Sequence, residues 1–229
     1  MRLEDMNWMD VERYLENDSR IILVTGATEQ HAYLSLMTDI LIPSRLALAV
    51  SEREGVVVAP PLNFGVSRIF TAFPGTISLT QQTFSRVLLE VVESLLHQGF
   101  RRFFILNGHG GNPVPEQLKD FNQADSEILV IWYNWWKEKA VQDFAAKHNL
   151  RLNHANWGEN FPFNRVAESP SGEKPTINPV DVGEYGEFAR EVLGDGSFGG
   201  LYQVDDALMD ELFGMVVDEI AGLIQHMAL

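Results

Sequence analysis

A glycine-rich turn that follows an apolar run is the feature that most constrains the fold of this chain. The apolar residues 103–106 lead directly into Asn107–Asn112, a segment that contains three glycines and His109. A buried strand that ends in such a turn presents a side chain at the sheet edge where ligands of open α/β proteins bind. Glycines let the backbone turn sharply and approach a ligand closely. The turn therefore predicts a ligand site at the carboxyl edge of a parallel sheet.

A second segment with the same pattern lies upstream. The apolar residues 21–24 lead into Thr25–Thr28, followed by Glu29 and His31, with Asp39 eight residues beyond His31. In extended backbone, residues two apart project from the same face and can converge on one centre. Two strand ends that each carry ligand-type side chains indicate a hydrolytic metal centre.

The rest of the chain alternates between strand and helix patterns. We expect strands near 21–25, 56–58, 102–106 and 128–133, and helices near 38–54, 80–98, from 113 onward, 137–148 and 205–226. This alternation predicts an α/β fold with a mostly parallel sheet covered by helices on both faces. Residues 151–180 are rich in Asn, Pro and Gly and are predicted to form an active-site loop. With no internal repeat or linker, residues 1–229 are expected to form a single domain.

Composition limits the partners and the cofactors. The chain has 17 basic and 32 acidic residues, and this net charge of −15 disfavours nucleic acid as a partner. It has no cysteine, so metal ligands must be His, Asp or Glu, which favours zinc, manganese or iron. No apolar run is long enough to span a membrane, and the charged N-terminus lacks a signal core. We therefore expect a cytoplasmic protein.

Several elements, taken together and in order, resemble the creatininase family of metal-dependent amidohydrolases. The matching elements are Glu29–His31 with Thr38–Asp39, then Phe73–Ser78, then Asn107–Asn112, then His154–Ala155 with Glu159. They occur in the family's order, cover about residues 20–165, and each falls at an expected strand end or in an expected loop.

The resemblance implies a three-layer α/β/α fold and a site for two divalent ions, which would be zinc, manganese or iron. Carried over residue by residue, the metal ligands are Glu29, His31, Asp39, His109 and Glu159, with Asp39 as the bridging ligand. His154 corresponds to a family histidine proposed to handle protons, and Glu159 is the other candidate for this catalytic role. The resemblance also implies a small-molecule amide substrate and a homo-oligomer, with a hexamer as the expected assembly.

These residue types suit the hydrolysis of a non-peptide C–N bond in a small amide, cyclic amide or formamide. A pair of divalent ions lowers the pKa of a shared water and polarises a carbonyl. The leaving nitrogen needs a proton, which His154 or Glu159 can supply. The backbone N–H groups of Asn107–Asn112 can add donors for the developing oxyanion.

The chain also departs from the family pattern near the expected substrate. Tyr33 stands where many relatives have a second histidine, and residues 69–72, which include Phe70, lack the histidine that commonly precedes Phe73. Gly111 occupies the position of a glutamate found in enzymes that act on creatinine, and Asn156 and Asn160 replace the usual glycine and threonine. Creatinine is therefore disfavoured as the substrate. The same departures motivate an alternative, a non-catalytic small-molecule-binding protein that retains the fold.

Other interpretations of single features stay open at this point. Asn107–Asn112 can cradle a phosphate, although it lacks the lysine and hydroxyl residue of a nucleotide-binding loop. A serine hydrolase is disfavoured because no G-x-S-x-G motif exists, and Ser67 follows only one glycine, Gly65. Asp39 can serve as a helix N-cap alone. Trp135, Trp136 and Trp157 can line a pocket or pack in the core.

Overall fold

A parallel sheet forms the centre of the computed structural model, which describes residues 1–122, 127–183 and 186–227. Its strand order is β2-β1-β3-β4. The strands are β1 (Arg20–Thr25), β2 (Val57–Val58), β3 (Arg102–Asn107) and β4 (Leu129–Asn134). Thr25 pairs with Asn107 and Asn107 pairs with Asn134, so three strands end at the same level. The loops that follow β1 and β3 therefore start side by side.

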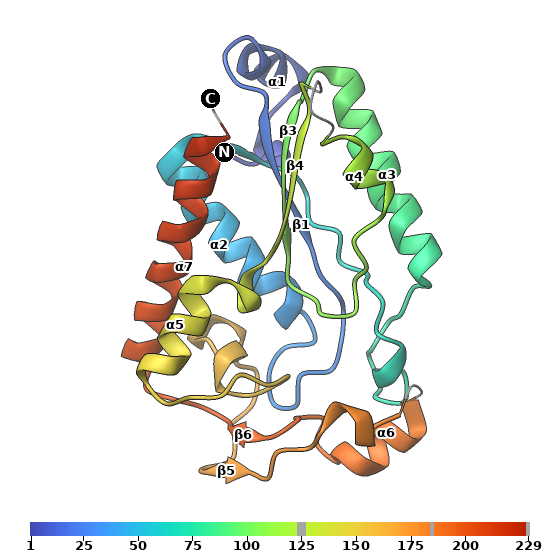
Figure 1. Cartoon of the computed structure of the whole chain (residues 1–229), viewed down its shortest axis with the longest axis vertical. Coiled ribbons are helices and arrows are strands. Elements are labelled where there is room, and N and C mark those ends of the chain that lie inside the picture. Colours follow the sequence, from blue (N-terminus) through green and yellow to red (C-terminus); the bar gives the residue numbers. More distant parts are fainter. Residues whose placement is uncertain (123–126, 184–185, 228–229) are drawn as a thin grey trace.

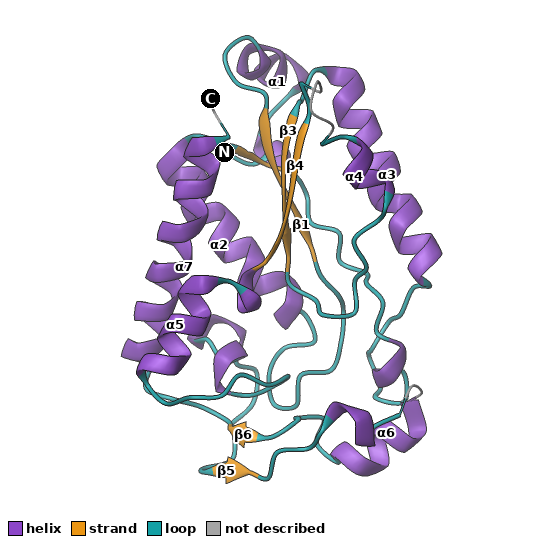
Figure 2. Cartoon of the chain, viewed as in Figure 1, coloured by secondary structure: helices purple, strands orange, loops and turns teal. Residues whose placement is uncertain are grey.

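Helices cover both faces of this sheet, as expected for a three-layer α/β/α fold (Figure 1). One layer contains α2 (Thr38–Glu54), α5 (Lys139–Lys147) and α7 (Asp206–His226), and the other contains α3 (Gln81–Gln98) and α4 (Gln117–Asp120). A short helix, α1 (Trp8–Leu15), packs at the end of the sheet opposite to the loops described above (Figure 2). No helix within the described ranges is both long and apolar enough to cross a membrane.

The strand sequences explain why both faces are covered. Ile22 and Phe104 pack with the apolar stripes of α2, α5 and α7, whereas their neighbours Ile21 and Phe103 pack with α3. Because successive strand residues point to opposite faces, an uninterrupted apolar strand needs a hydrophobic partner on each side. The apolar runs in β1 and β3 thus dictate the two helical layers.

Most predicted elements are confirmed, with corrections at a few places. Thr80 caps α3 by accepting a hydrogen bond from the Thr83 backbone N–H, and Gly99 ends this helix with φ of 117°. A helix follows β3 as expected, but its predicted start near Pro113 is wrong, since residues 113–116 are not helical and α4 begins at Gln117. The helices α1 and α6 (Gly186–Leu193) were not expected from the sequence.

A segment past the carboxyl ends of the strands contains α6 and an antiparallel pair, β5 (Glu173–Lys174) and β6 (Gly200–Leu201) (Figure 1). The Lys174 ammonium holds it together by donating to the backbone carbonyls of Leu193 and Ser197, at 2.6 and 2.7 Å, beside Asp195. The residues from 151 onward that were expected to be a loop form the first part of this region.

The first turn of α2 lies directly on the sheet edge. A Cβ atom at Gly26 would lie 2.2 Å from the backbone oxygen of Asp39, and one at Gly108 would lie 2.0 Å from the same oxygen. Real Cβ atoms do not approach this closely, so both strand ends need glycine for α2 to begin where it does. These two glycines set the position of the Asp39 backbone.

We predict that Gly108→Ala lowers the free energy of unfolding by about 1–3 kcal/mol or more, because the added methyl must displace the backbone of Asp39. Urea unfolding measures this change. Gly110→Ala in the same turn is the matched control, since its Cβ would meet nothing nearer than Trp136, at 3.8 Å. Equal stability of the two variants would contradict the packing argument.

Candidate metal centre

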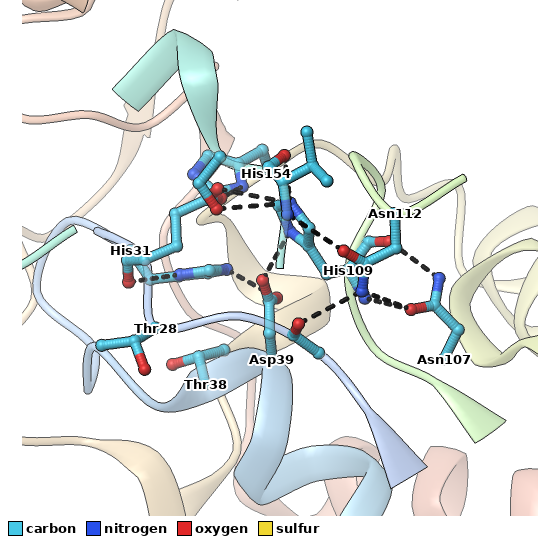
Figure 3. Close-up of polar contacts among 12 residues, drawn as sticks. Thr28, His31, Thr38, Asp39, Asn107, His109, Asn112 and His154 are labelled. Atoms are coloured by element: carbon cyan, nitrogen blue, oxygen red, sulfur yellow. Dashed lines mark hydrogen bonds and ion pairs between the residues drawn. The ribbon is translucent and has the colours of Figure 1, made fainter. Parts of the chain in front are cut away.

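Six side chains from four segments converge at the carboxyl ends of β1 and β3, and Figure 3 labels four of them, His31, Asp39, His109 and His154. Glu29 and His31 follow β1, Asp39 lies in the first turn of α2, and His109 follows β3. These four residues are buried, with at most 5% of their surface exposed. His154 and Glu159, from the loop after α5, complete the group with 20% and 15% of their side-chain surface exposed. The sequence-predicted site residues are thus brought together in one place.

The acidic and histidine side chains form two clusters that share Asp39. Glu29, Asp39 and His109 offer one ligand atom each within 4.8 Å of one another, and so do His31, Asp39 and Glu159. Asp39 Oδ2 lies 2.7 Å from His109 Nδ1, whereas its Oδ1 lies 3.0 Å from His31 Nε2. Its two carboxylate oxygens therefore face different clusters, as a bridging ligand requires.

The orientation of His31 and His109 is fixed by backbone carbonyls. His31 Nδ1 lies 3.1 Å from the Glu29 carbonyl oxygen, and His109 Nε2 lies 2.9 Å from the Val66 carbonyl oxygen. A carbonyl only accepts, so these ring nitrogens carry the hydrogens and donate them. In the neutral ring the other nitrogen is bare, and in both residues it faces a carboxylate. Hydrogen bonds of this kind, from the ring nitrogen that does not bind metal, orient histidine ligands toward an ion.

Several buried atoms of the centre have no hydrogen-bond partner among the described residues. They are the two carboxylate oxygens of Glu29, whereas Asp39 Oδ2 and His31 Nε2 are buried opposite other ligand-type atoms, His109 Nδ1 and Asp39 Oδ1. Buried charged atoms without a partner carry a large desolvation cost unless a cation compensates them. Nitrogen and oxygen ligands in this number fit divalent ions of the zinc, manganese and iron type. The donor set therefore fits a pair of ions.

Without an ion, protons would have to compensate the carboxylates. Burial opposes the charged form of the histidines, but Asp39 raises the pKa of His31 to about 10, and Glu29 with Asp39 raises that of His109 to about 9. Burial raises the pKa of Glu29 to about 7 and also raises that of Glu159. For Asp39, the two histidines outweigh burial and hold its pKa well below the ordinary value.

His154 differs from the other two histidines. Its Nε2 lies 2.9 Å from the side-chain nitrogen of Gln30, and its Nδ1 lies 3.7 Å from Glu29 Oε1. Its ring stacks on Phe70, with centroids 4.5 Å apart, and meets Phe198 edge-on. Burial and the neighbouring His31 lower its pKa well below the ordinary value. His154 is therefore neutral in this setting.

The turn that carries His109 is held by asparagines. Asn107 donates to the His109 carbonyl at 2.7 Å, while the His109 N–H donates to Asn107 Oδ1 at 3.3 Å. Asn112 bridges the Gly26 carbonyl and the Val66 N–H, each at 3.1 Å. The His109 N–H expected to stabilise an oxyanion is thus already engaged. The adjacent acidic residues also disfavour the phosphate interpretation of this turn.

Ser67, His109 and Asp39 form a contact series that resembles a serine-hydrolase triad. Ser67 Oγ lies 3.4 Å from His109 Nε2, and His109 Nδ1 contacts Asp39. However, His109 Nε2 carries its hydrogen toward the Val66 carbonyl and so cannot accept the proton of Ser67. Ser67 itself is only 2% exposed. This geometry disfavours Ser67 as a nucleophile.

The aromatic residues and the positions that depart from the family pattern make contacts that support the structure. Trp135 and Trp157 are core residues, and Trp136 is partly buried against the same hydrophobic cluster and contacts the ring of Trp135. Tyr33 packs edge-on against Tyr202, 5.8 Å away.

The Asp39 side chain accepts no capping hydrogen bond, because α2 has Met37 at its N-cap. The N-cap interpretation of Asp39 is therefore wrong.

The side chain of Asn156 bonds the Arg151 carbonyl and the Gly158 N–H, and Asn160 bonds the Tyr202 carbonyl and Arg165. Sequence reasoning missed Gln30, Val66, Phe198 and Gly196 as neighbours of the centre. Gln30 lies inside the Glu29–His31 element, which offered a signal, whereas nothing in the sequence connects residues near 196 to His154.

Comparison with known proteins identifies similar chains. A family model described as creatininase, creatinine amidohydrolase, matches residues 4–224. Creatinine amidohydrolase of Pseudomonas putida is 31% identical over 154 residues, which cover 60% of this chain and 59% of that protein. 3-Dehydro-scyllo-inosose hydrolase of Thermotoga maritima is 27% identical, covering 61% of this chain and 46% of that protein. A mycofactocin precursor peptide peptidase of Mycolicibacterium smegmatis is 37% identical over 40% of each chain.

These alignments span less than two thirds of the length of the curated relatives. The solved structures cover the chain more fully. A putative creatinine amidohydrolase from Bacteroides fragilis has a TM-score of 0.77 at 24% identity and covers 100% of this chain and 96% of its own. A creatininase point mutant complexed with creatine has a TM-score of 0.75 at 22% identity, with coverages of 98% and 97%. At these identities the likeness establishes the three-layer fold.

We predict that zinc binding to chelator-treated protein at neutral pH releases at least about two protons, because His31 and His109 are protonated there and must become bare to bind, and Glu29, with a pKa of about 7, gives up part of a further proton. Calorimetry in two buffers of different ionisation enthalpy measures this release. Raising the pH removes the competing protons, so affinity should increase with pH until about pH 9–10, where both histidines have lost their extra protons. A His226→Gln variant, changed at an exposed helix end, should behave like the wild type. Binding without proton release would contradict the assigned orientations.

Proposed function

Because this chain belongs to the creatininase family, we propose that it is a metal-dependent hydrolase that cleaves a C–N bond in a small amide, cyclic amide or formamide. One ion would be held by Glu29, Asp39 and His109. The other would be held by His31, Asp39 and Glu159. The assembly and location expected above, a cytoplasmic homo-oligomer, stay predictions.

One observation carries this proposal. Two clusters share the Asp39 carboxylate, and in each cluster a backbone carbonyl takes the hydrogen of one histidine nitrogen, so the nitrogen that can lose its proton and bind an ion is the one that faces Asp39. The arrangement of donors around Asp39 therefore supports ions on both sides of it.

The donor set and the relatives limit the ions to a few. Imidazole and carboxylate ligands without thiolate suit zinc, manganese or iron. Solved creatininases include a manganese form and a Zn-Zn form, which are 21% and 22% identical to this chain. We propose that this chain likewise takes divalent ions of this class.

The residues of the chain then have distinct tasks. When bound, a pair of divalent ions supplies a nucleophilic water at neutral pH and polarises the amide carbonyl. Asp39 neutralises part of the added charge and sets the spacing of the two clusters. Glu159 is held in place by the Ala155 N–H, which donates to its Oε2 at 2.6 Å. His154 stands beside both clusters, where it can donate to the reacting amide.

Gly111 argues against creatinine as the substrate. A Cβ at Gly111 would lie 2.1 Å from the Val66 backbone oxygen and 2.6 Å from His109 Nε2. No larger side chain fits there without moving the ligand histidine. Since enzymes that act on creatinine are expected to carry a glutamate at this position, we propose a different small amide as the substrate.

No observation favours the non-catalytic alternative. Asn156 and Asn160 hold backbone atoms of their own loop, and Tyr33 packs on Tyr202. None of these positions removes a member of either cluster. A measurement of metal content distinguishes the two functions, because a binding protein that has lost turnover has no need of both ions.

Elemental analysis of protein purified without chelator tests the proposal. We expect about two divalent ions per chain in the wild type and almost none in a His31→Ala/His109→Ala double variant, because each cluster loses its only nitrogen ligand. The His226→Ala variant should keep the wild-type content. A wild type that lacks ions and takes up neither zinc, manganese nor iron(II) would overturn the proposal.

We further predict that Glu159→Gln lowers the content to about one ion per chain, because only the cluster of His31, Asp39 and Glu159 loses a charged ligand. Hydrolysis in a screen of small amides and formamides should fall at least about a hundredfold. Glu168→Gln, on an exposed part of the neighbouring loop, is the matched control. Loss of both ions together would show that the clusters do not bind independently.

A further inference from the structure

Gln30 lies between the two ligand positions Glu29 and His31, and its side chain has three partners. Its Oε1 accepts the Ala32 backbone N–H at 3.1 Å, and its Nε2 donates to the Gly196 carbonyl at 3.0 Å. The same Nε2 lies 2.9 Å from His154 Nε2. The side chain thus joins the turn after β1 to the segment past the strand ends.

The backbone partners settle which end of the amide is which. An N–H can only donate and a carbonyl can only accept, so Oε1 must face Ala32 and Nε2 must face Gly196. The second hydrogen on Gln30 Nε2 then points at His154. His154 Nε2 must accept it and is therefore bare, so the hydrogen of the neutral ring lies on Nδ1.

The chain adopts unusual backbone conformations around this amide. Ala32 has φ of 51°, in the left-handed region that a residue with a side chain rarely occupies. Gly196 has φ of 97°, and a Cβ there would lie 1.8 Å from Gln30 Oε1. The strain at Ala32 persists only where surrounding contacts determine it, and its hydrogen bond to Gln30 is one of these contacts. Glycine at 196 leaves the space that the Gln30 amide fills.

Aromatic rings fix the plane of His154 as well. Phe70 stacks on it with an interplanar angle of 19°, and Phe198 meets it at 90°. The ring therefore cannot rotate freely to exchange its two nitrogens. With Nε2 engaged by Gln30, the nitrogen turned toward Glu29 is Nδ1, 3.7 Å from Oε1.

We propose that Gln30 is a positioning residue, which holds His154 as a neutral ring with its hydrogen on Nδ1, so that His154 faces the centre as a hydrogen-bond donor and not as a metal ligand. This rests on the proposed function. The Nδ1–H is placed to stabilise the amide oxygen as it gains negative charge. The grouping of His154 with Glu29 and His31 is then a contact between a donor and a ligand set, and does not form a third metal site.

The test is solid-state NMR of zinc-treated protein labelled with ¹⁵N-histidine, in which a nitrogen that carries hydrogen is separated from a bare one. The His154 signals are assigned by their loss in His154→Gln. We expect hydrogen on Nδ1 in the wild type. In Gln30→Glu, whose carboxylate only accepts, the ratio of the two tautomers should shift toward Nε2–H by at least about fivefold.

Two further variants keep the result interpretable. Gln30→Met, without donor or acceptor, should give a mixture of tautomers, and Gln82→Glu, the same charge change at an exposed position of α3, should leave the wild-type pattern. Zinc content should stay near the wild-type value in Gln30→Glu, Gln30→Met and Gln82→Glu. Hydrogen on Nε2 of His154 in the wild type, or a zinc-bound Nδ1, would overturn the positioning role even if the variants failed to fold. Absence of zinc from the wild type would overturn the proposed function instead.

Discussion

The position of Asp39 is the constraint on which the rest of the site depends. Its backbone oxygen lies where a methyl group at either Gly26 or Gly108 would collide with it, so the first turn of α2 touches the ends of both β1 and β3. From that position one carboxylate oxygen reaches His31 Nε2 and the other reaches His109 Nδ1. Because packed interiors transmit displacement rather than absorb it, a shift of α2 by one methyl diameter would separate both clusters at once.

Three histidines in one buried space have different properties because their outer partners differ. Carbonyl oxygens of Glu29 and Val66 take the outer hydrogens of His31 and His109, which leaves bare nitrogens directed inward. The side-chain N–H of Gln30 donates to Nε2 of His154, so the hydrogen of the His154 ring lies on Nδ1 and points toward the centre. Backbone and amide groups outside the centre therefore decide which ring can bind a cation and which can bind an electron-rich substrate atom.

The sequence predicts the elements well because apolar strands and amphipathic helices carry strong local patterns, as in β3 and α3. It also predicts which residues gather, since strands of a parallel sheet bring their carboxyl ends to one edge. It does not predict the tautomer of His154, because that depends on Gln30 and Gly196, which are 166 residues apart in the chain. The helix α6 was missed because its eight residues are too few for the apolar spacing to repeat, and Trp135 and Trp157 were left open because burial depends on packing from other elements.

Metal binding and substrate choice are physically separable in this architecture. Four of the five ligand positions, all except Glu159, depend on the sheet edge and on glycines at strand ends, where contacts leave no space for change. The positions that depart from the family pattern depend on other contacts, such as Tyr33 against Tyr202 and Asn160 with Arg165, within the segment past the strand ends. Side chains of that segment other than His154 and Glu159 can change without removing a member of either cluster. A chain of this fold can therefore keep the two clusters while the surface offered to the substrate differs.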